Sequence, residues 1–401
     1  MKKIFALVLA LCLCLTAFAA MADGIAKEDI KLGVITLHDE LSTYDKNFID
    51  AAKEAAKNMG LTEDQIKIIS GIPESEACYD TAAELAEDGF NIVFADSFGH
   101  EDFMIKAAKE FPNVEFCHAT GTKAHTEKLA NYHNAFAAIY EGRYLAGVAA
   151  GLKLNEIKEA GNLKGEVPMM GYVGAFTYAE VMSGYTSFYL GAKSVCPDVI
   201  MKVQFTGSWY DEKEEKAAAE ALIAAGADLI SQHADSMGAP TACENAGIPD
   251  VSYNGSTVES CPNTFIVASR IDWAPYFEYI VNQKKAGEAI DTDWTGTIAT
   301  GSVVLTDVNE KAAAAGTVDK IAEIKAQFEA GTLHVFDTAT EGFILVDGKA
   351  LESYTADVDT DEAFTPDTEV VADGYFHESE YRSAPYFDVK IDGIELLNTA
   401  F

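Results

Sequence analysis

Short apolar runs rich in Val, Ile and Phe alternate along this chain with longer segments of helical periodicity. The first cycle contains a predicted strand over residues 30–35, a predicted helix over 47–59 that ends at Gly60, and a second strand over 65–69. These strand-like runs are apolar on both faces, which is typical of strands buried on both sides of a sheet. Regular alternation with helices indicates βαβ units with parallel strands. The sequence therefore predicts an α/β fold built on parallel sheets.

A second cycle of the same kind follows a long predicted helix over residues 134–154. We expect further helices at 75–87, 101–110, 178–195 and 213–225, and further strands at 91–94, 114–118, 169–173, 200–205, 229–232 and 250–253. A chain of 401 residues, 49% of them hydrophobic, is long enough for two buried cores. The two cycles therefore predict two doubly wound sheets in succession.

In doubly wound sheets, ligands bind beyond the carboxyl ends of the strands. The residues that follow the predicted strands are rich in aromatics, His, Asn and Asp, and Lys and Arg are nearly absent from them. They are residues 36–44, 95–100, 119–122, 174–176, 206–209, 233–236 and 254–256. A site without Lys or Arg offers no clamp for a phosphate or carboxylate.

The overall charge is strongly negative. Asp and Glu number 64 against 29 Lys and Arg, which gives a formal net charge of -35. Such a surface repels duplex DNA and anionic membranes, so a nucleic-acid polymer is a poor partner. A small neutral or weakly polar ligand is compatible with this charge.

The first 22 residues have the pattern of a signal peptide. Lys2 and Lys3 form a basic start, residues 4–19 are apolar, and a small-x-small site ends at Ala22. The apolar run is shorter than the ~20 residues that span a bilayer, and no later segment resembles a span. We expect cleavage near Ala22 and a periplasmic or otherwise extracytoplasmic location. Lipidation of a cysteine in this segment is less favoured, because the two candidates each follow Leu.

The remaining cysteines are Cys78, Cys117, Cys196, Cys243 and Cys261. Their number is odd, so at most two disulfides can form, and the sequence leaves the pairing open. Cys117 lies in an apolar strand-like run, where a buried thiol is favoured.

Several motifs in order along the chain resemble one known family. They are FADSFGH at 94–100, FCHATG at 116–121, YEGRYLAGVAAG at 140–151, GYVGAF at 171–176, SQHADSMG at 231–238 and GYFHESEYRSAPYFD at 374–388. Together they resemble the basic membrane protein (BMP) family of ABC-transporter substrate-binding proteins, which includes purine-nucleoside receptors.

The resemblance implies a type I periplasmic-binding-protein fold, with two doubly wound parallel-sheet lobes joined by crossover hinges near Gly151, Ser269 and a later segment. We then expect the following division: a signal peptide at 1–22, lobe 1 from 23–150 and part of 270–345, lobe 2 from 151–269 and part of 300–345, and a C-terminal extension at 346–401 that packs on the lobes.

The nucleoside receptors of this family carry a Ser-Phe-Asn before the first helix, and its aromatic ring stacks on the purine. The corresponding residues here are Thr43, Tyr44 and Asp45, so an aromatic is kept. The same receptors carry a Lys late in the second lobe that engages the ribose, whereas this chain has Trp273 at that place and no Lys. The resemblance thus implies a purine ligand, and the missing Lys favours a nucleobase over a nucleoside.

The candidate stacking residues share a position just after a strand or at a predicted crossover. They are Tyr44, Phe98, Phe176, Trp209 and Trp273. An aromatic ring stacked on a base contributes ~1–3 kcal/mol. We expect Tyr44 and Trp273 to stack on opposite faces of one flat ring. Core packing is the alternative for each of them, and for Tyr44 also a hydrophobic staple at the helix start.

The candidate polar contacts are Ser97, His100, His118, Asp235 and Asn254. Neutral imidazole donates at one nitrogen and accepts at the other, which suits purine ring nitrogens. A carboxylate accepts from an exocyclic amino group, and an amide can pair with an adenine edge. The alternatives are a metal site at the histidines and a helix N-cap at Asp235 or Ser97.

These observations favour a binding protein that captures an adenine-like base, or a nucleoside, by hinge closure. We expect no catalysis, no metal and no cofactor. The expected partners are the small-molecule ligand and an ABC permease in the inner membrane, and the protein is expected to be a monomer. The alternatives are an exported hydrolase with Ser97 as nucleophile and His377 as base, and a ligand-sensing receptor domain for a signalling partner.

Overall fold

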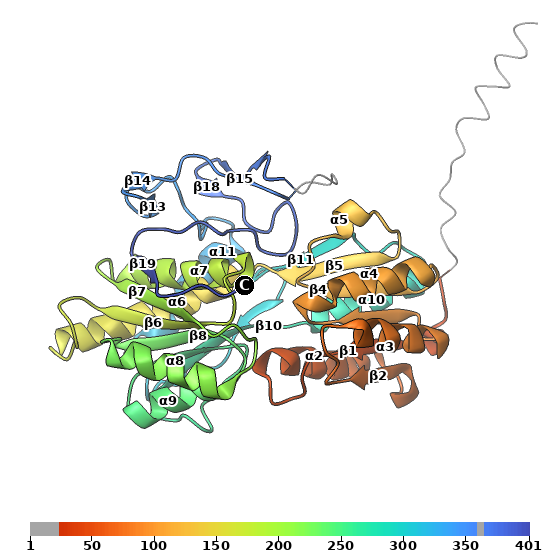
Figure 1. Ribbon diagram of the computed structural model, residues 1–401, viewed down its shortest axis with the longest axis horizontal. Coiled ribbons are helices and arrows are strands. Elements are labelled where there is room, and N and C mark those ends of the chain that lie inside the picture. The colour runs from red at the N-terminus through yellow and green to blue at the C-terminus, as the bar shows by residue number, and fades with distance from the viewer. Residues whose placement is uncertain (1–23, 359–364) are drawn as a thin grey trace, which may run out of the picture.

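The protein forms two lobes that lie side by side, each with a sheet between layers of helices (Figure 1). The computed structural model describes residues 24–358 and 365–401. The predicted signal peptide over 1–22, with its cleavage site near Ala22, lies outside the described residues. The α/β fold with two doubly wound, mainly parallel sheets is confirmed.

Lobe 1 contains a six-stranded sheet in the order β11-β5-β4-β3-β1-β2, with every pair parallel. Its strands are β1 (Leu32–Ile35), β2 (Ile66–Ile69), β3 (Ile92–Ala95), β4 (Glu115–Ala119), β5 (Tyr132–Ala137) and β11 (Asp293–Gly296). Its helices are α2 (Thr43–Met59), α3 (Glu76–Glu87), α4 (Glu101–Glu110), α5 (Ala124–Glu127) and α10 (Ala274–Ala286), with short 3-10 helices η1 (Lys27–Asp29), η2 (Glu63–Gln65) and η3 (Phe98–His100).

Strand β3 shows how one sheet builds two cores. Successive side chains of a strand point to opposite faces. Phe94 packs with residues of α2 and α10, whereas Val93 and Ala95 pack with residues of α3 and α4. Helix α2 ends at Gly60 in the left-handed conformation, with φ of 63°, as the sequence indicates.

Lobe 2 contains a seven-stranded sheet in the order β12-β10-β9-β8-β6-β7-β19, in which only β12 runs antiparallel to its neighbour. Its strands are β6 (Met169–Gly174), β7 (Ile200–Phe205), β8 (Leu229–His233), β9 (Asp250–Tyr253), β10 (Phe265–Ile271), β12 (Val303–Leu305) and β19 (Ile394–Leu396). Its helices are α6 (Ile139–Glu159), α7 (Ala179–Val195), α8 (Glu212–Ala224), α9 (Gly238–Ala246) and α11 (Thr317–Glu329).

Helices α6 and α7 pack backbone against backbone on one face of the lobe 2 sheet. A Cβ atom on Gly147 would lie 2.0 Å from the Phe188 carbonyl oxygen, and one on Gly191 would lie 2.0 Å from that of Tyr144. Only glycine permits this approach. Helix α6 therefore belongs to lobe 2, and the first crossover lies just before it, at residues 137–139, rather than near Gly151.

The prediction of one helix over residues 134–154 is wrong at its start. Residues 132–137 form strand β5, and the helix begins at Ile139. All six residues of β5 are buried, because this strand fills the sheet between β4 and β11. Tertiary placement thus overrides the helical propensity of the alanines in this segment. The later crossovers follow β10 and β11.

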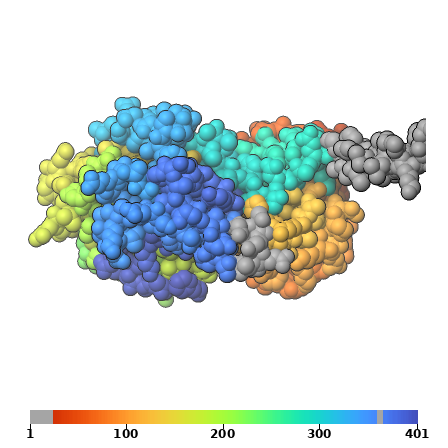
Figure 2. Space-filling view, turned by 90° about the horizontal axis from the view of Figure 1, so that it is seen from above, coloured from red at the N-terminus to blue at the C-terminus, as the bar shows by residue number. Residues whose placement is uncertain are grey.

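The C-terminal extension packs mainly on lobe 2 and reaches lobe 1 (Figure 2). It contains the short strands β13 (Leu345–Val346), β14 (Lys349–Ala350), β15 (Thr355–Ala356), β16 (Thr368–Glu369), β17 (Val371–Ala372) and β18 (Tyr375–Phe376), before β19 joins the lobe 2 sheet beside β7. On the lobe 1 side, the Ser383 N–H donates to Asp293 Oδ2 at 2.9 Å. The extension therefore contacts both lobes.

The structure also shows the state of the cysteines and the character of the helices. Cys78, Cys117, Cys196, Cys243 and Cys261 are all free and buried. Within residues 24–358 and 365–401, no helix combines the length and the apolar character needed to cross a bilayer.

Candidate ligand-binding site

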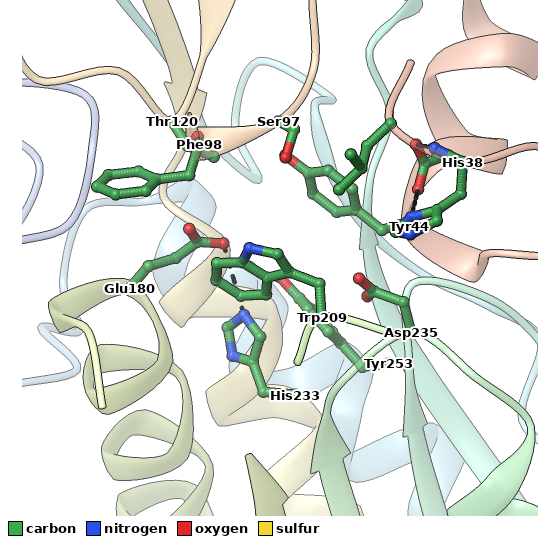
Figure 3. Close-up of a pocket in the computed structure, with 12 residues that line it drawn as sticks. His38, Tyr44, Ser97, Phe98, Thr120, Glu180, Trp209, His233, Asp235 and Tyr253 are labelled. Atoms are coloured by element: carbon green, nitrogen blue, oxygen red, sulfur yellow. Dashed lines mark hydrogen bonds and ion pairs between the residues drawn. The ribbon is translucent and has the colours of Figure 1, made fainter. Parts of the chain in front are cut away.

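A pocket of about 370 Å³ lies between the lobes, beyond the carboxyl ends of strands from both sheets (Figure 3). Lobe 1 contributes Leu37, His38, Tyr44, Asp45, Ser97, Phe98 and Thr120, and lobe 2 contributes Glu180, Trp209, His233, Asp235 and Tyr253. No Lys or Arg is among these lining residues. Five of the ten predicted ligand residues line the pocket: Tyr44, Ser97, Phe98, Trp209 and Asp235.

Tyr44 stands in the first turn of α2, with its ring on the pocket wall. The Ser42 side chain caps this helix by accepting a hydrogen bond from the backbone N–H of Asp45. The Tyr44 hydroxyl donates to the Asp96 carbonyl oxygen at 2.8 Å, and its ring meets Phe48 edge-to-face at 4.9 Å between centroids. Burial raises the Tyr44 pKa well above its ordinary value, so the hydroxyl keeps its proton for this bond.

Asp45 and His38 close the loop between β1 and α2. The His38 backbone N–H donates to Asp45 Oδ1 at 2.7 Å, and the Ser42 hydroxyl donates to Oδ2 at 2.5 Å. Burial opposes ionisation of Asp45, but the hydrogen bonds from His38 and Ser42 outweigh it and hold its pKa below the ordinary value. Asp45 therefore lines the pocket as a charged group whose oxygens are already engaged.

The loop after β3 is held by two buried histidines. His118 Nε2 donates to the Ser97 carbonyl oxygen at 2.7 Å, and His100 Nε2 donates to the Ile72 carbonyl oxygen at 2.9 Å. Burial lowers the pKa of each histidine to about 4, so both are neutral at pH 7. Neither lines the pocket. The expectation that His100 and His118 contact the ligand is corrected: their ring N–H groups are used to hold the backbone.

Aromatic rings from both lobes meet at one end of the pocket. Phe176 stacks on Tyr178 with centroids 5.0 Å apart and meets Trp209 edge-to-face at 5.1 Å. The Tyr178 ring lies 5.5 Å from Phe98 of the other lobe. Trp209 and Phe98 line the pocket, whereas Phe176 does not line it and instead supports Trp209 from the side.

Asp235 follows β8 and is buried on the lobe 2 wall. Burial, and then the negative charges of Asp45, Glu215 and Glu180, raise its pKa well above the ordinary value. A carboxyl group that keeps its proton can donate one hydrogen bond and accept others. Asn254 Nδ2 lies 3.4 Å from Asp235 Oδ1. Asn254 itself does not line the pocket, because its side chain is directed at Asp235.

Direct hydrogen bonds join the two lobes beside the pocket. The Thr43 backbone N–H donates to the Asp235 carbonyl oxygen at 3.1 Å, and its hydroxyl donates to the same oxygen at 3.3 Å. Asn47 Nδ2 donates to the Asn254 carbonyl oxygen at 3.0 Å. The start of α2 in lobe 1 thus contacts the strand-end loops of lobe 2, and the cleft is closed.

Trp273 does not form the expected sandwich with Tyr44. Its side chain is only 1% exposed and stacks on Phe48 with centroids 4.5 Å apart. Phe48 in turn meets Tyr44, so the two proposed stacking rings are separated by a third. Trp273 points into the lobe 1 core because it caps α10, which packs against α2. The core alternative is therefore the correct one for Trp273.

Five polar or aromatic lining residues were not singled out from the sequence. His233 and Tyr253 are the last residues of β8 and β9, so the strand-end rule carried a signal for them. Thr120 follows β4 and has φ of 65°, a strained value for a β-branched residue that the sequence does not reveal. Glu180 is the second residue of α7, and His38 follows β1.

The two residues of the hydrolase alternative, Ser97 and His377, are each engaged with a different partner. The Ser97 hydroxyl donates to Glu74 Oε1 at 2.6 Å, and in the described part of the chain no histidine hydrogen-bonds to that hydroxyl. His377 instead lies 2.7 Å from Glu380 Oε2 in the extension. Among the described residues, no group of three or more His, Cys, Asp or Glu side chains is placed to hold a metal ion.

Two lobes with a pocket between them are the arrangement of the type I periplasmic-binding-protein fold. Solved structures of ABC-transporter solute-binding proteins share this fold. One from Conexibacter woesei is 19% identical with a TM-score of 0.62, over 76% of this chain and 98% of that one. One from Aeropyrum pernix is 16% identical with a TM-score of 0.64, over 78% and 94%.

The sequence places the chain in a particular family. Residues 32–334 match the Bmp family, described as PnrA-like ABC transporter substrate-binding proteins, so the chain belongs to this family and is a substrate-binding protein of an ABC transporter. The expected family is thereby confirmed. The match ends before the C-terminal extension begins.

Curated relatives differ in the ligand that their names state. A purine-binding protein of Brucella abortus is 34% identical over 272 residues, which is 67% of this chain and 71% of the relative. A Haloferax volcanii protein named for glucose binding, TsgA13, is 31% identical over 53% of this chain and 51% of its own. The nucleoside-binding protein BmpA of Lactococcus lactis is 29% identical over 56% and 61%.

Proposed function

We propose that this protein captures a purine nucleobase, with adenine preferred, outside the cytoplasm and delivers it to an ABC permease. The observation that carries the proposal is the pocket itself, which combines aromatic rings from both lobes with carboxyl groups and has no Lys or Arg in its lining. The names of the Brucella and Lactococcus relatives, which state purine and nucleoside binding, support the same ligand class.

The rings suit a flat heterocycle. Tyr44 and Phe98 of lobe 1 face Trp209 and Tyr253 of lobe 2 across the pocket (Figure 3). A stacked base gains ~1–3 kcal/mol from each such ring. A ligand held by rings of both lobes stabilises the closed arrangement over the open one, which is the requirement for capture by hinge closure.

The polar lining favours a base that carries an amino group. Asp235 offers a buried carboxyl group on the lobe 2 wall, where Glu180 adds a second, and Asp45 adds a third from lobe 1. Carboxyl oxygens accept hydrogen bonds from an exocyclic amino group. A nucleoside is the second candidate, and the absence of a Lys that could engage a ribose makes it the weaker ligand.

Ligand identity is tested by mass spectrometry of the small molecules released from undialysed, denatured protein. Calorimetric titration of the emptied protein with adenine, guanine, adenosine, guanosine and glucose then ranks the candidates. We expect adenine to bind most tightly and the protein to remain monomeric by light scattering. Binding of glucose with no binding of any purine would refute the proposal.

A further inference from the structure

Glu180 occupies a distinctive position on the lobe 2 wall. It is the second residue of α7, where the partial positive charge of a helix N-terminus favours an anionic side chain. Its side chain is 12% exposed and lines the pocket between Phe98 and His233 (Figure 3). Its Oε1 lies 3.5 Å from His233 Nε2.

His233 is held so that it presents one particular nitrogen to Glu180. Its ring packs on Tyr253 with centroids 4.5 Å apart, and a Cβ atom on Gly184 would lie 2.6 Å from His233 Nδ1. His233 Nδ1 is buried and has no hydrogen-bond partner among the described residues. Burial lowers the His233 pKa, so the ring is neutral. Because Nδ1 has no partner and Nε2 lies 3.5 Å from Glu180 Oε1, the single proton is assigned to Nε2.

A buried cation lies behind this pair. Arg143 is fully buried and forms no ion pair in the described part of the chain, and its guanidinium lies 4.7 Å from the Tyr253 ring centroid. Its hydrogen bonds run to neutral groups, which are the Tyr172 hydroxyl, the Ser231 hydroxyl and the Gln232 carbonyl oxygen. The charges of Arg143 and Glu180 both act on His233, in opposite directions.

Several hydroxyl protons near the ligand are already committed. Tyr44 donates to the Asp96 carbonyl oxygen, Ser97 donates to Glu74, and Thr120 donates to the Ala119 carbonyl oxygen. These oxygens can offer the ligand only their lone pairs. Together with the pocket carboxyl groups, they make a lining with more acceptors than donors, so it matches a ligand with several N–H groups.

Building on the proposed function, we propose that Glu180 is the residue that determines specificity for an amino-substituted base. His233 fixes one carboxylate oxygen, and the other accepts a hydrogen bond from the amino group of the ligand. From the sequence alone, Asp235 rather than Glu180 is the residue expected to accept from the amino group.

The Glu180→Gln variant reverses the polarity of this contact without changing its shape. The Nε2–H of His233 needs an acceptor, so the new amide turns its carbonyl oxygen to the histidine and its NH₂ group to the pocket. A carbonyl on the ligand then becomes the better partner. Adenine and hypoxanthine are the probes, because they carry an amino group and a carbonyl, respectively, at the same ring carbon.

Wild type and Glu180→Gln are titrated calorimetrically with both bases. We expect the wild type to prefer adenine and the ratio of the two dissociation constants to shift toward hypoxanthine by roughly ten- to 100-fold in the variant. Glu214→Gln, at an exposed glutamate in the first turn of α8, is the matched control and should keep the wild-type ratio. Thermal melts report whether the variants fold. If Glu180→Gln does not fold, Glu180→Ala is used in its place and should abolish the adenine preference.

The outcomes separate this inference from the proposed function. Equal losses for both bases, or an unchanged ratio in the folded variant, overturn the role of Glu180 and leave purine binding intact. A wild type that binds neither base overturns the proposed function and the assignment of Glu180 with it.

Discussion

Trp209 and Trp273 are both candidate stacking residues from the sequence, but they have different roles in the structure. Substituting each to Ala distinguishes the two roles. Trp209 lines the pocket and is half-buried, whereas Trp273 is buried in the lobe 1 core. Removal of Trp209 takes away one stacking face, which costs ~1–3 kcal/mol of affinity. This corresponds to roughly five- to 150-fold in the dissociation constant for adenine. The empty protein should melt close to the wild-type temperature.

Trp273→Ala should act on stability instead. Its ring contacts Phe48 at 4.5 Å, Phe94 at 5.9 Å and Tyr276 at 6.1 Å between centroids, so truncation leaves a cavity inside a closely packed aromatic cluster. A buried Trp→Ala change costs ~3–5 kcal/mol, which lowers the melting temperature by roughly 5–10 °C. The affinity of the protein that remains folded should stay near that of the wild type.

The assay pairs calorimetric titration of adenine with thermal melts of the empty variants. Tryptophan fluorescence adds a direct readout, because the chain has only three Trp residues. Trp209→Phe should abolish the ligand-induced change in emission, and Trp273→Phe should keep it. Two results would contradict these roles: a loss of affinity in Trp273→Ala at an unchanged melting temperature, or wild-type affinity for adenine in Trp209→Ala.

Three further substitutions test other parts of the structure. Burial raises the Glu378 pKa to about 7, so the folded protein favours the protonated form, and the free energy of unfolding falls by about 3 kcal/mol as pH rises from below 4.5 through 7. Glu378→Gln should therefore melt above the wild type at pH 8 but not at pH 4.5. The exposed Glu380→Gln is the control. Asn47→Ala removes one interlobe hydrogen bond and should weaken ligand binding by roughly two- to tenfold, with a more open free protein by small-angle scattering. Gly184→Ala should displace the His233 ring and lower the affinity for adenine. An affinity equal to that of the wild type would contradict the close packing of His233 against Gly184.

Much of the fold is predictable because parallel sheets leave a strong pattern in the sequence. Buried strands such as β1 and β3 are apolar on both faces. Gly60 marks the end of α2, because glycine readily adopts the left-handed backbone conformation that ends this helix. Strand β5 is not predictable in this way. Its sequence is compatible with a helix, and only its place between two other strands makes it extended. Because the first crossover directly follows β5, its position is not predictable either.

The site is predictable only as far as strand ends determine it. The rule that ligands bind beyond the carboxyl ends of strands locates Ser97, Trp209 and Asp235. The rule does not predict whether a side chain at such a position points into the cleft or into the core, because this depends on the direction of the following helix. The Trp273 side chain points into the core. Glu180 is found only when the start of α7 is placed beside the end of β8.

The closed cleft is maintained by few direct contacts between the lobes. The hydrogen bonds from Thr43 and Asn47 lie beside the pocket, and the rings of Phe98 and Tyr178 meet across it. Each hydrogen bond contributes about 0.5–1.5 kcal/mol net, so these contacts alone give a modest bias toward closure. Moving a two-state equilibrium from mostly open to mostly closed takes about 5.5 kcal/mol of differential binding. On the proposed function, a ligand that contacts rings and carboxyl groups of both lobes would supply a term of this size only in the closed form, and closure would then report occupancy to the permease.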